Sequence, residues 1–473
     1  MNPTPQGGSG RSRRLFTGVA LATLVVAAAI LISRPSNATP GRAGETTFSN
    51  ETGALGVLGF TGSTVDNPFF EPLGTNGRSC ASCHRPAQGW SITPADLRDR
   101  FDASDGLDPV FRPNDGSNCP GADVSTSRKR RRAFSLLLAK GLIRVALDVP
   151  ARAEFDILRV EDPYGCNAPL SVASMYRRPL PSANLKFVSA VMWDGRASAA
   201  GHDVREGLVA QVHDAVTGHF QGTPPAEAQV QAIVDFELGL YAAQVQSRAA
   251  GRLDAATAHG GPRGMARAPF CIGINDPLNM LPAMPGVCPS MSGGLDPFVF
   301  SLFRGWTDDE SPQRRAIARG EAIFNTRQFV IDNVAGLNGG PEDPIRRPLL
   351  NGTCTVCHDT PQAGNHSVPM ALNIGVAAAA RRTPDLPLYT LRHRLTGETA
   401  QTTDPGRAMV TGRWKDIGKF KGPVLRALAA RGPFFHDGSA ATLADVIRFY
   451  DTRFQARFTE EEKADLLAFL QAL

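Results

Sequence analysis

Two short segments of the chain carry two cysteines and a histidine at the same spacing. They are Cys80-Ala81-Ser82-Cys83-His84 and Cys354-Thr355-Val356-Cys357-His358. The C-x-x-C-H spacing lets two thiols bond to the two vinyl groups on one edge of a porphyrin, and it places an imidazole under the ring, where it can bind iron. Each segment therefore predicts a covalently bound haem c, with His84 and His358 as the iron ligands.

Other sites also use paired cysteines. Two C-x-x-C pairs can form one Cys₄ zinc site, and a single pair can act as a thiol–disulfide redox centre. A zinc site does not need a histidine directly after both pairs. Cys354 also lies 271 positions after Cys83, which is far wider than the spacing of a zinc ribbon. The pattern therefore favours two haem groups.

The other four cysteines are predicted to be structural. They are Cys119, Cys166, Cys271 and Cys288. An even number of cysteines in an exported protein favours disulfides, and four cysteines allow three connectivities. We favour Cys119–Cys166 and Cys271–Cys288, because each pair lies within one segment between the haem motifs.

Residues 1–38 have the features of an export signal. Arg11–Arg14 supply a positive end, Leu15–Ile32 form an apolar run, and Ser36-Asn37-Ala38 offers a cleavage site of small residues. The apolar run has 18 residues, which approaches the length of a spanning helix, so a retained N-terminal anchor is the alternative to cleavage. Both interpretations predict a periplasmic protein, either soluble or anchored at its N-terminus.

The charge of the chain excludes a broad nucleic-acid-binding surface. The formal net charge is +5, but residues 1–38 contribute four arginines and no acid, which leaves +1 for the rest. Five consecutive bases, Arg128–Arg132, form one local cluster. This cluster is expected to be the exposed start of a helix, and the alternative is a docking patch for an acidic electron donor. We predict no nucleic-acid partner.

The spacing of apolar residues predicts a mainly α protein with long loops. No segment alternates convincingly between apolar and polar residues, and Phe134–Leu147 has the apolar spacing of a helix. A short amphipathic helix opens near Arg314, and Gly320 would let it cross another helix closely. A capping box at Thr459–Glu462 begins an amphipathic terminal helix.

A leading helix, a haem motif and a terminal helix follow each other in the order of a class I cytochrome c domain. We therefore predict two class I cytochrome c-like haem domains with long loops and insertions. The N-terminal haem domain is expected at residues 39–310, with insertions near 104–180 and 251–300. The C-terminal haem domain is expected at residues 311–473.

Two further motifs narrow the family. They are Trp193-Asp194-Gly195-Arg196-Ala197 and the segment Gly432–Ser439, which reads GPFFHDGS. With the two C-x-x-C-H motifs in this order, the chain resembles the bacterial dihaem cytochrome c peroxidase family, which includes the MauG-type enzymes. The resemblance runs from about residue 70 to the end. It implies that the first haem reacts with hydrogen peroxide and that the second haem transfers electrons.

The resemblance also assigns roles to single residues. Trp193 matches a tryptophan that relays electrons between the haems, and the alternative is a core aromatic. His436 matches a histidine that lies near the second haem and is not its axial ligand. Gln211 and His219 fit best to the glutamine and the acid/base residue over the open face of the first haem. Glu206 is the alternative acid.

The first haem is predicted to be open to peroxide. Many peroxidases of this family block the first iron with a second histidine that soon follows the motif. No histidine lies between His84 and His202 in this chain. His202 and His213 are expected to be surface or structural residues.

The sixth ligand of the second haem is predicted to be a tyrosine. Ordinary peroxidases of the family place a methionine fourteen residues after the histidine of the H-D-G motif, and that position here is Tyr450. MauG-type enzymes resemble this chain in having a tyrosine there. A thioether raises the potential of haem iron, whereas a phenolate favours oxidised iron. If Tyr450 is a core residue instead, Met409 is the next candidate, ahead of Met370.

The resemblance also implies further binding partners. Family members often bind one calcium between the haems, and Asn184, Arg431 and Pro433 are the candidate ligands here. The expected electron donor is a small cytochrome c or cupredoxin. The alternatives are a MauG-type enzyme that uses peroxide to oxidise side chains of a partner protein, and a non-enzymatic dihaem electron-transfer cytochrome.

Overall fold

The computed structural model describes residues 38–42, 44–62, 66–198, 203–255, 257–279, 288 and 295–473. The predicted export signal at residues 1–38 lies outside the described residues except for its last position, and His202 also lies outside them. No helix in the described ranges is long and apolar enough to cross a membrane.

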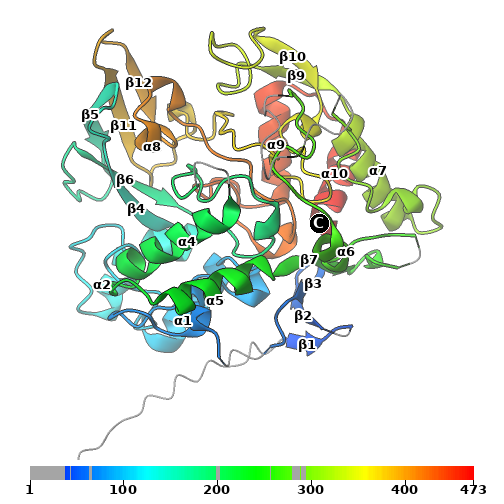
Figure 1. The fold of residues 1–473 in the computed structure, drawn as a ribbon, viewed down its shortest axis with the longest axis horizontal. Coiled ribbons are helices and arrows are strands. Elements are labelled where there is room, and N and C mark those ends of the chain that lie inside the picture. The colour runs from blue at the N-terminus through cyan, green and yellow to red at the C-terminus, as the bar shows by residue number, and fades with distance from the viewer. Residues whose placement is uncertain are drawn as a thin grey trace, which may run out of the picture. The chain divides into compact units, whose positions relative to one another are not determined.

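Most of the helices are short and are separated by long loops (Figure 1). The α-helices are α1 (Pro94–Ser104), α2 (Ser127–Ala133), α3 (Ser135–Lys140), α4 (Val204–Asp214), α5 (Glu227–Leu238), α6 (Arg263–Arg267), α7 (Pro312–Thr326), α8 (Ala408–Thr411), α9 (Leu443–Phe454) and α10 (Glu460–Ala472). A π-helical turn, Ala215–His219, extends α4.

The strands form antiparallel sheets in the order β1-β2-β3-β7-β8, β10-β9, β12-β11-β5 and β4-β6. The strands are β1 (Ala38–Pro40), β2 (Glu45–Asn50), β3 (Gly53–Leu58), β4 (Ile143–Asp148), β5 (Phe155–Glu161), β6 (Val172–Arg177), β7 (Tyr241–Ser247), β8 (Gly251–Arg252), β9 (Phe329–Asp332), β10 (Leu349–Gly352), β11 (Leu388–His393) and β12 (Thr399–Thr402).

This strand content corrects the expectation of a mainly α protein. The strands have seven residues at most, and their buried positions do not alternate regularly; β4, for example, buries two consecutive residues. A two-residue period is weak in so short a segment when both faces are partly covered. Many partner strands are also distant in sequence, so local patterns do not reveal the pairing.

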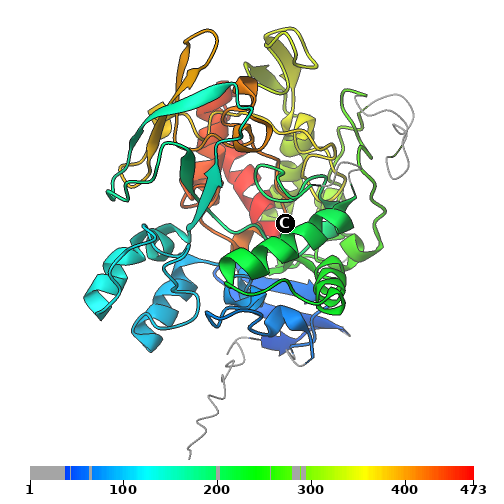
Figure 2. The same cartoon turned by 60° about the vertical axis from the view of Figure 1, so that its left-hand side comes forward.

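One sheet joins the two halves of the chain. Strand β5 pairs with β11, which lies more than two hundred positions further along. The teal strand β5 lies beside the orange strands β11 and β12 in both views (Figures 1 and 2). The segment predicted as an insertion near 104–180 therefore packs against the C-terminal half.

The predicted helix at Phe134–Leu147 is wrong in its second half. Helix α3 ends at Lys140, and Gly141 adopts the left-handed conformation with φ 65°. Glycine adopts this conformation without the penalty that a Cβ atom brings, and it commonly ends helices. Ile143 and Val145 then lie in strand β4, where branched side chains pack well.

The predicted first and last helices of the C-terminal half are confirmed. Helix α7 covers the region near Arg314, and α10 begins at the capping box of Thr459 and Glu462. The two helices cross at Gly320. A Cβ atom on Gly320 would collide with the backbone oxygen of Asp465 and would lie 2.7 Å from Cβ of Phe469. The close crossing therefore requires glycine.

We expect Gly320→Ala to lower the free energy of unfolding by about 1–3 kcal/mol, because the added methyl group forces α7 and α10 apart. Urea unfolding of the haem-loaded protein, followed by far-UV circular dichroism, measures this change. Gly121→Ala is the matched control, because a Cβ atom at Gly121 meets nothing within 4 Å. Equal midpoints for the two variants would contradict the close crossing.

Candidate functional site

The first C-x-x-C-H motif forms a tight turn that presents its side chains to one cavity. Cys80–Ser82 form a 3₁₀ turn, and the His84 amide donates to the Cys80 carbonyl at 2.9 Å. Nδ1 of His84 lies 3.0 Å from the Trp90 carbonyl oxygen. A carbonyl only accepts, so Nδ1 carries the proton and Nε2 is left as a ligand. Cys80, Cys83 and His84 all line the cavity.

The second motif repeats this arrangement in another cavity. The His358 amide donates to the Cys354 carbonyl at 3.1 Å, and Nδ1 of His358 donates to the Gly364 carbonyl at 2.7 Å. Burial lowers the pKa of both His84 and His358, which favours the neutral imidazole that iron requires. The two sites therefore orient their histidines by the same device.

Two of the predicted peroxide-site residues line the same cavity as His84. Gln211 of α4 and His219 of the π-helical turn line this cavity, whereas Glu206 and His213 do not. π-Helical turns are rare and occur frequently at functional sites. The structure therefore brings Gln211 and His219 to the same cavity as the first haem motif.

His219 is held by two residues that the sequence analysis missed. Nδ1 of His219 forms a short hydrogen bond with Oδ2 of Asp115, and Oδ1 of Asp115 pairs with the guanidinium of Arg78. Burial alone would raise the pKa of Asp115, but the bond to His219 and the charge of Arg78 lower it below its ordinary value. Asp115 is therefore a carboxylate that accepts a hydrogen bond from Nδ1–H of His219. No motif marks Asp115, which lies in a loop.

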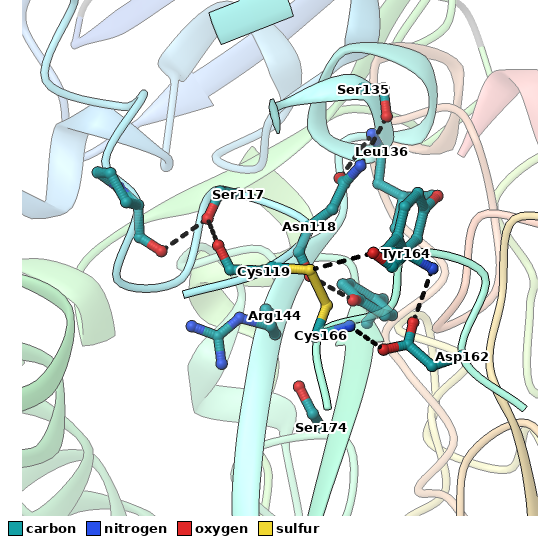
Figure 3. Close-up of a disulfide and its surroundings, with 12 residues drawn as sticks. Ser117, Asn118, Cys119, Ser135, Leu136, Arg144, Asp162, Tyr164, Cys166 and Ser174 are labelled. Carbon is teal, nitrogen blue, oxygen red and sulfur yellow. Dashed lines mark hydrogen bonds between the residues drawn. A yellow bond between two sulfur atoms is a disulfide. The ribbon is translucent and has the colours of Figure 1, made fainter. Parts of the chain in front are cut away.

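A disulfide stabilises the segment that carries Asp115 (Figure 3). Cys119 is bonded to Cys166, and Cys271 to Cys288, so both favoured pairings are confirmed. Next to Cys119, the Asn118 side chain donates to Oγ of Ser135 at 2.7 Å. The disulfide and this hydrogen bond therefore anchor the loop within four residues of Asp115.

A second acidic residue at the first cavity also escaped the sequence analysis. Glu237 of α5 lines the cavity, is 5% exposed, and has one carboxyl oxygen with no hydrogen-bond partner among the described residues. Burial raises the pKa of Glu237 to about 8, so its carboxyl group is mostly protonated at neutral pH.

The second cavity contains Tyr450. Helix α9 places Ile447, Tyr450 and Phe454 on the face that lines this cavity, and the Tyr450 ring centroid lies 6.5 Å from that of His358. Met409 does not line the cavity. It is buried in a separate apolar core with Tyr389 and neighbouring strand residues. The structure therefore argues against Met409 as the alternative ligand.

Trp193 lies between the two cavities and lines both of them. Its Nε1 donates to the Arg178 carbonyl at 2.8 Å, and its own carbonyl accepts from the Lys421 amide at 2.9 Å. The indole ring is 6.3 Å from the ring of His436, which lines the second cavity. Neither ring nitrogen of His436 has a hydrogen-bond partner among the described residues.

Three cations at these cavities, two of them buried and Lys421 partly buried, have no carboxylate partner in the described part of the chain. They are Arg178, Lys421 and Arg431. Burial lowers the pKa of Lys421 to about 8 and that of Arg431 to about 10. A buried cation is costly unless an anion accompanies it.

The two cavities therefore fit haem c. Each offers two thiols, one oriented imidazole and an apolar wall, and the cations match the two propionate groups of a haem. The residues of the first motif, Cys80, Cys83 and His84, would hold one haem. Those of the second motif, Cys354, Cys357 and His358, would hold the other.

The predicted calcium ligands do not fit a calcium ion. The Asn184 amide is engaged by the Ala242 backbone, donating at 2.8 Å and accepting at 3.0 Å. The Arg431 carbonyl accepts from Nη2 of Arg178 at 2.9 Å. Asn184 lines neither cavity, whereas Pro433 lines only the second. The Arg178 guanidinium group is therefore already hydrogen-bonded to the Arg431 carbonyl oxygen, one of the expected calcium ligands.

The basic cluster Arg128–Arg132 lies on α2 and is partly neutralised. Its ion pairs join Lys129 to Asp123, Arg130 to Asp105 and Arg131 to Asp102. This arrangement is that of an exposed helix, and a docking role stays a prediction.

Comparisons with known proteins were made for the whole chain. No protein-family model matches the sequence. The cytochrome-c peroxidase IdrP1 of Denitromonas iodatirespirans is 34% identical over 143 residues, which are 25% of this chain and 36% of that protein. The cytochrome c551 peroxidase of Nitrosomonas europaea is 37% identical over 76 residues, which are 15% of this chain and 23% of that protein.

A crystal structure of a MauG-like protein associated with microbial copper homeostasis aligns with 86% of each chain, at 15% identity and a TM-score of 0.39. The chain spans about a third of the length of the cytochrome-c peroxidases IdrP1 that it matches. The expected resemblance to cytochrome-c peroxidases is confirmed over that part.

Removal of the thiols tests the haem assignment. We expect the mature protein to contain two haem groups per chain, and Cys354→Ala with Cys357→Ala to contain one, because each C-x-x-C pair attaches one haem. The pyridine haemochrome assay and the intact mass measure this. Replacing Cys119 and Cys166 by alanine is the control and should leave both haems in place. A full haem content in the first variant would refute the assignment.

Proposed function

We propose that the protein is a periplasmic dihaem c-type peroxidase that reduces hydrogen peroxide to water with electrons from a small cytochrome c or cupredoxin. The observation that carries this proposal is the His219–Asp115 pair, which lines the same cavity as His84. The similarity to cytochrome-c peroxidases supports the same reaction.

The bound haem would supply the iron at which the O–O bond of peroxide is cleaved. The chain supplies the proton transfer. Asp115 accepts a hydrogen bond from Nδ1–H of His219, so Nε2 is free to take a proton from one peroxide oxygen and to return it to the other. Gln211 adds an amide donor for the departing oxygen.

Trp193 provides the path for electrons within the chain. It lines both cavities, and an aromatic ring between two redox centres shortens each electron-transfer step. A Trp193 that only filled the core would not need to contact both cavities. The proposed periplasmic location rests on the predicted export signal, and the proposed electron donor rests on the family resemblance.

We expect His219→Ala to lower the kcat of peroxide reduction by about 10²- to 10⁴-fold, because the general acid–base group is lost. Steady-state assays with an artificial reduced donor measure this. His213→Ala is the matched control, because His213 lies on α4 and does not line the cavity. If both variants keep the wild-type rate, His219 is not the proton-transfer group.

The pH dependence tests Asp115. The pKa of Asp115 is lowered below that of an ordinary carboxyl group. Its ion pair with Arg78 and its bond to His219 are therefore fully formed at pH values above the ordinary carboxyl pKa. They are lost only as the pH falls through the lowered pKa. The wild type should therefore keep the Asp115–Arg78 ion pair in mildly acidic buffer. Asp115→Asn should lose activity at every pH, because the amide no longer selects the Nδ1-protonated form of His219. A wild-type rate for Asp115→Asn would contradict this role.

A second candidate function is oxidation of side chains in a partner protein, as in MauG-type enzymes. The position of Tyr450 in the second cavity favours it, because a phenolate ligand stabilises oxidised iron. Mixing the fully oxidised enzyme with one equivalent of peroxide, without reductant, distinguishes the two. A persistent oxidised species that involves both haems favours protein oxidation, whereas no such species favours the donor-dependent peroxidase.

We expect Tyr450→Phe to change the optical and electron paramagnetic resonance spectra of the second haem and to raise its reduction potential, because the phenolate is lost. Tyr241→Phe is the control, because Tyr241 lines neither cavity. Spectra of Tyr450→Phe that match the wild type would show that Tyr450 is only a core residue.

A further inference from the structure

Arg178 is a buried arginine whose side chain donates only to backbone carbonyl groups. Nη1 donates to Lys140 at 2.8 Å, and Nη2 donates to Ile92 at 2.6 Å and to Arg431 at 2.9 Å. These carbonyls belong to three distant segments: the loop after the first haem motif, the end of α3, and the start of the Gly432–Ser439 motif. One guanidinium group thus gathers three separate parts of the chain.

The surroundings of Arg178 are those of a cation site. Backbone carbonyl oxygens are among the ligands of calcium ions, and three of them converge here on one positive charge. Arg178 is 4% exposed, lines both cavities, and forms no salt bridge with the described carboxylates. Burial and the nearby Arg431 lower the pKa of Arg178 to about 9.

The backbone of Arg178 holds the residues between the cavities. Its amide donates to the His436 carbonyl at 2.7 Å, and its carbonyl accepts from Nε1 of Trp193 at 2.8 Å. Any movement of Arg178 therefore moves Trp193 and His436 as well.

We propose that the guanidinium group of Arg178 is the resident cation between the two cavities, that it takes the place of the calcium ion expected from the family resemblance, and that it positions Trp193. A calcium ion dissociates, whereas a guanidinium group is part of the chain and keeps its charge and its fork of donors. The arrangement of Trp193 is then independent of the calcium concentration. This inference concerns the structure between the cavities and does not depend on which substrate is oxidised.

The metal content of the purified protein with its haems tests the first part. We expect inductively coupled plasma mass spectrometry to find at most about a tenth of a calcium ion per chain, far below the one ion per chain of a filled site. The haem spectra and the rate of electron transfer between the haems should be the same before and after dialysis against EGTA. One calcium per chain, with spectra or rates that change after its removal, would overturn the proposal.

Substitutions test the positioning role. Arg178→Gln removes the charge and should slow electron transfer between the haems by about tenfold or more, because lost hydrogen bonds to a charged group displace Trp193. Stopped-flow mixing of the half-reduced protein measures this rate. Arg178→Lys keeps the charge with fewer oriented donors and should restore part of the rate.

Arg426→Gln is the matched control. Arg426 is equally buried and also donates to three backbone carbonyls, those of Leu473, Gln362 and Gly261, but it lines neither cavity. Both glutamine variants should lose thermal stability, and only Arg178→Gln should lose the transfer rate. If the two variants slow the transfer equally, or neither slows it, Arg178 has only the structural role of Arg426 and the positioning role is refuted.

Discussion

The buried ion cluster around Arg177 is the interaction on which the arrangement between the cavities depends. Arg177 donates to Asp194 at 2.5 Å and to Asp404 at 2.7 and 2.8 Å. Asp194 follows Trp193 directly, while Asp404 comes from the other half of the chain. The guanidinium group also lies 5.8 Å from the Phe420 ring, which stacks on His436. The cluster therefore fixes the W-D-G-R turn against the half of the chain that carries the second haem motif.

Arg178, the next residue in the chain, has the opposite electrostatic environment. The carboxylates of Asp404 and Asp194 raise the pKa of Arg177 although burial alone would lower it, whereas burial lowers the pKa of Arg178, which has no carboxylate beside it. Removing one member of a buried ion pair costs several kcal/mol, about 3–5 in measured cases. The ion pairs of Arg177 thus stabilise the folded chain. The cations without carboxylates, Lys421 among them, leave room for the anionic groups of the cofactor and favour its binding.

The sequence predicted the chemistry of the site better than the fold around it. The haem motifs depend on residue types at a fixed short spacing, the favoured disulfides on cysteines that share one segment, and the crossing on a glycine within an amphipathic helix, and one sequence reveals each of these. The sheets depend on pairs such as β5 with β11, whose partners have no local signal. Asp115 was missed for the same reason: it acts on His219 across 104 positions, and only the folded loop brings the two together.

The location of Asp115 has a consequence for how the peroxide site is built. His84 and His219 lie outside the predicted insertions, whereas Asp115 lies in the insertion predicted near 104–180. The loop is fixed by Arg144, whose amide donates to the Asp115 carbonyl at 2.7 Å, and by the Cys119–Cys166 bond. In the proposed peroxidase, the iron ligand and the proton-transfer group thus come from outside the predicted insertions. The insertion, cross-linked by a disulfide, supplies the carboxylate that selects the Nδ1-protonated form of His219.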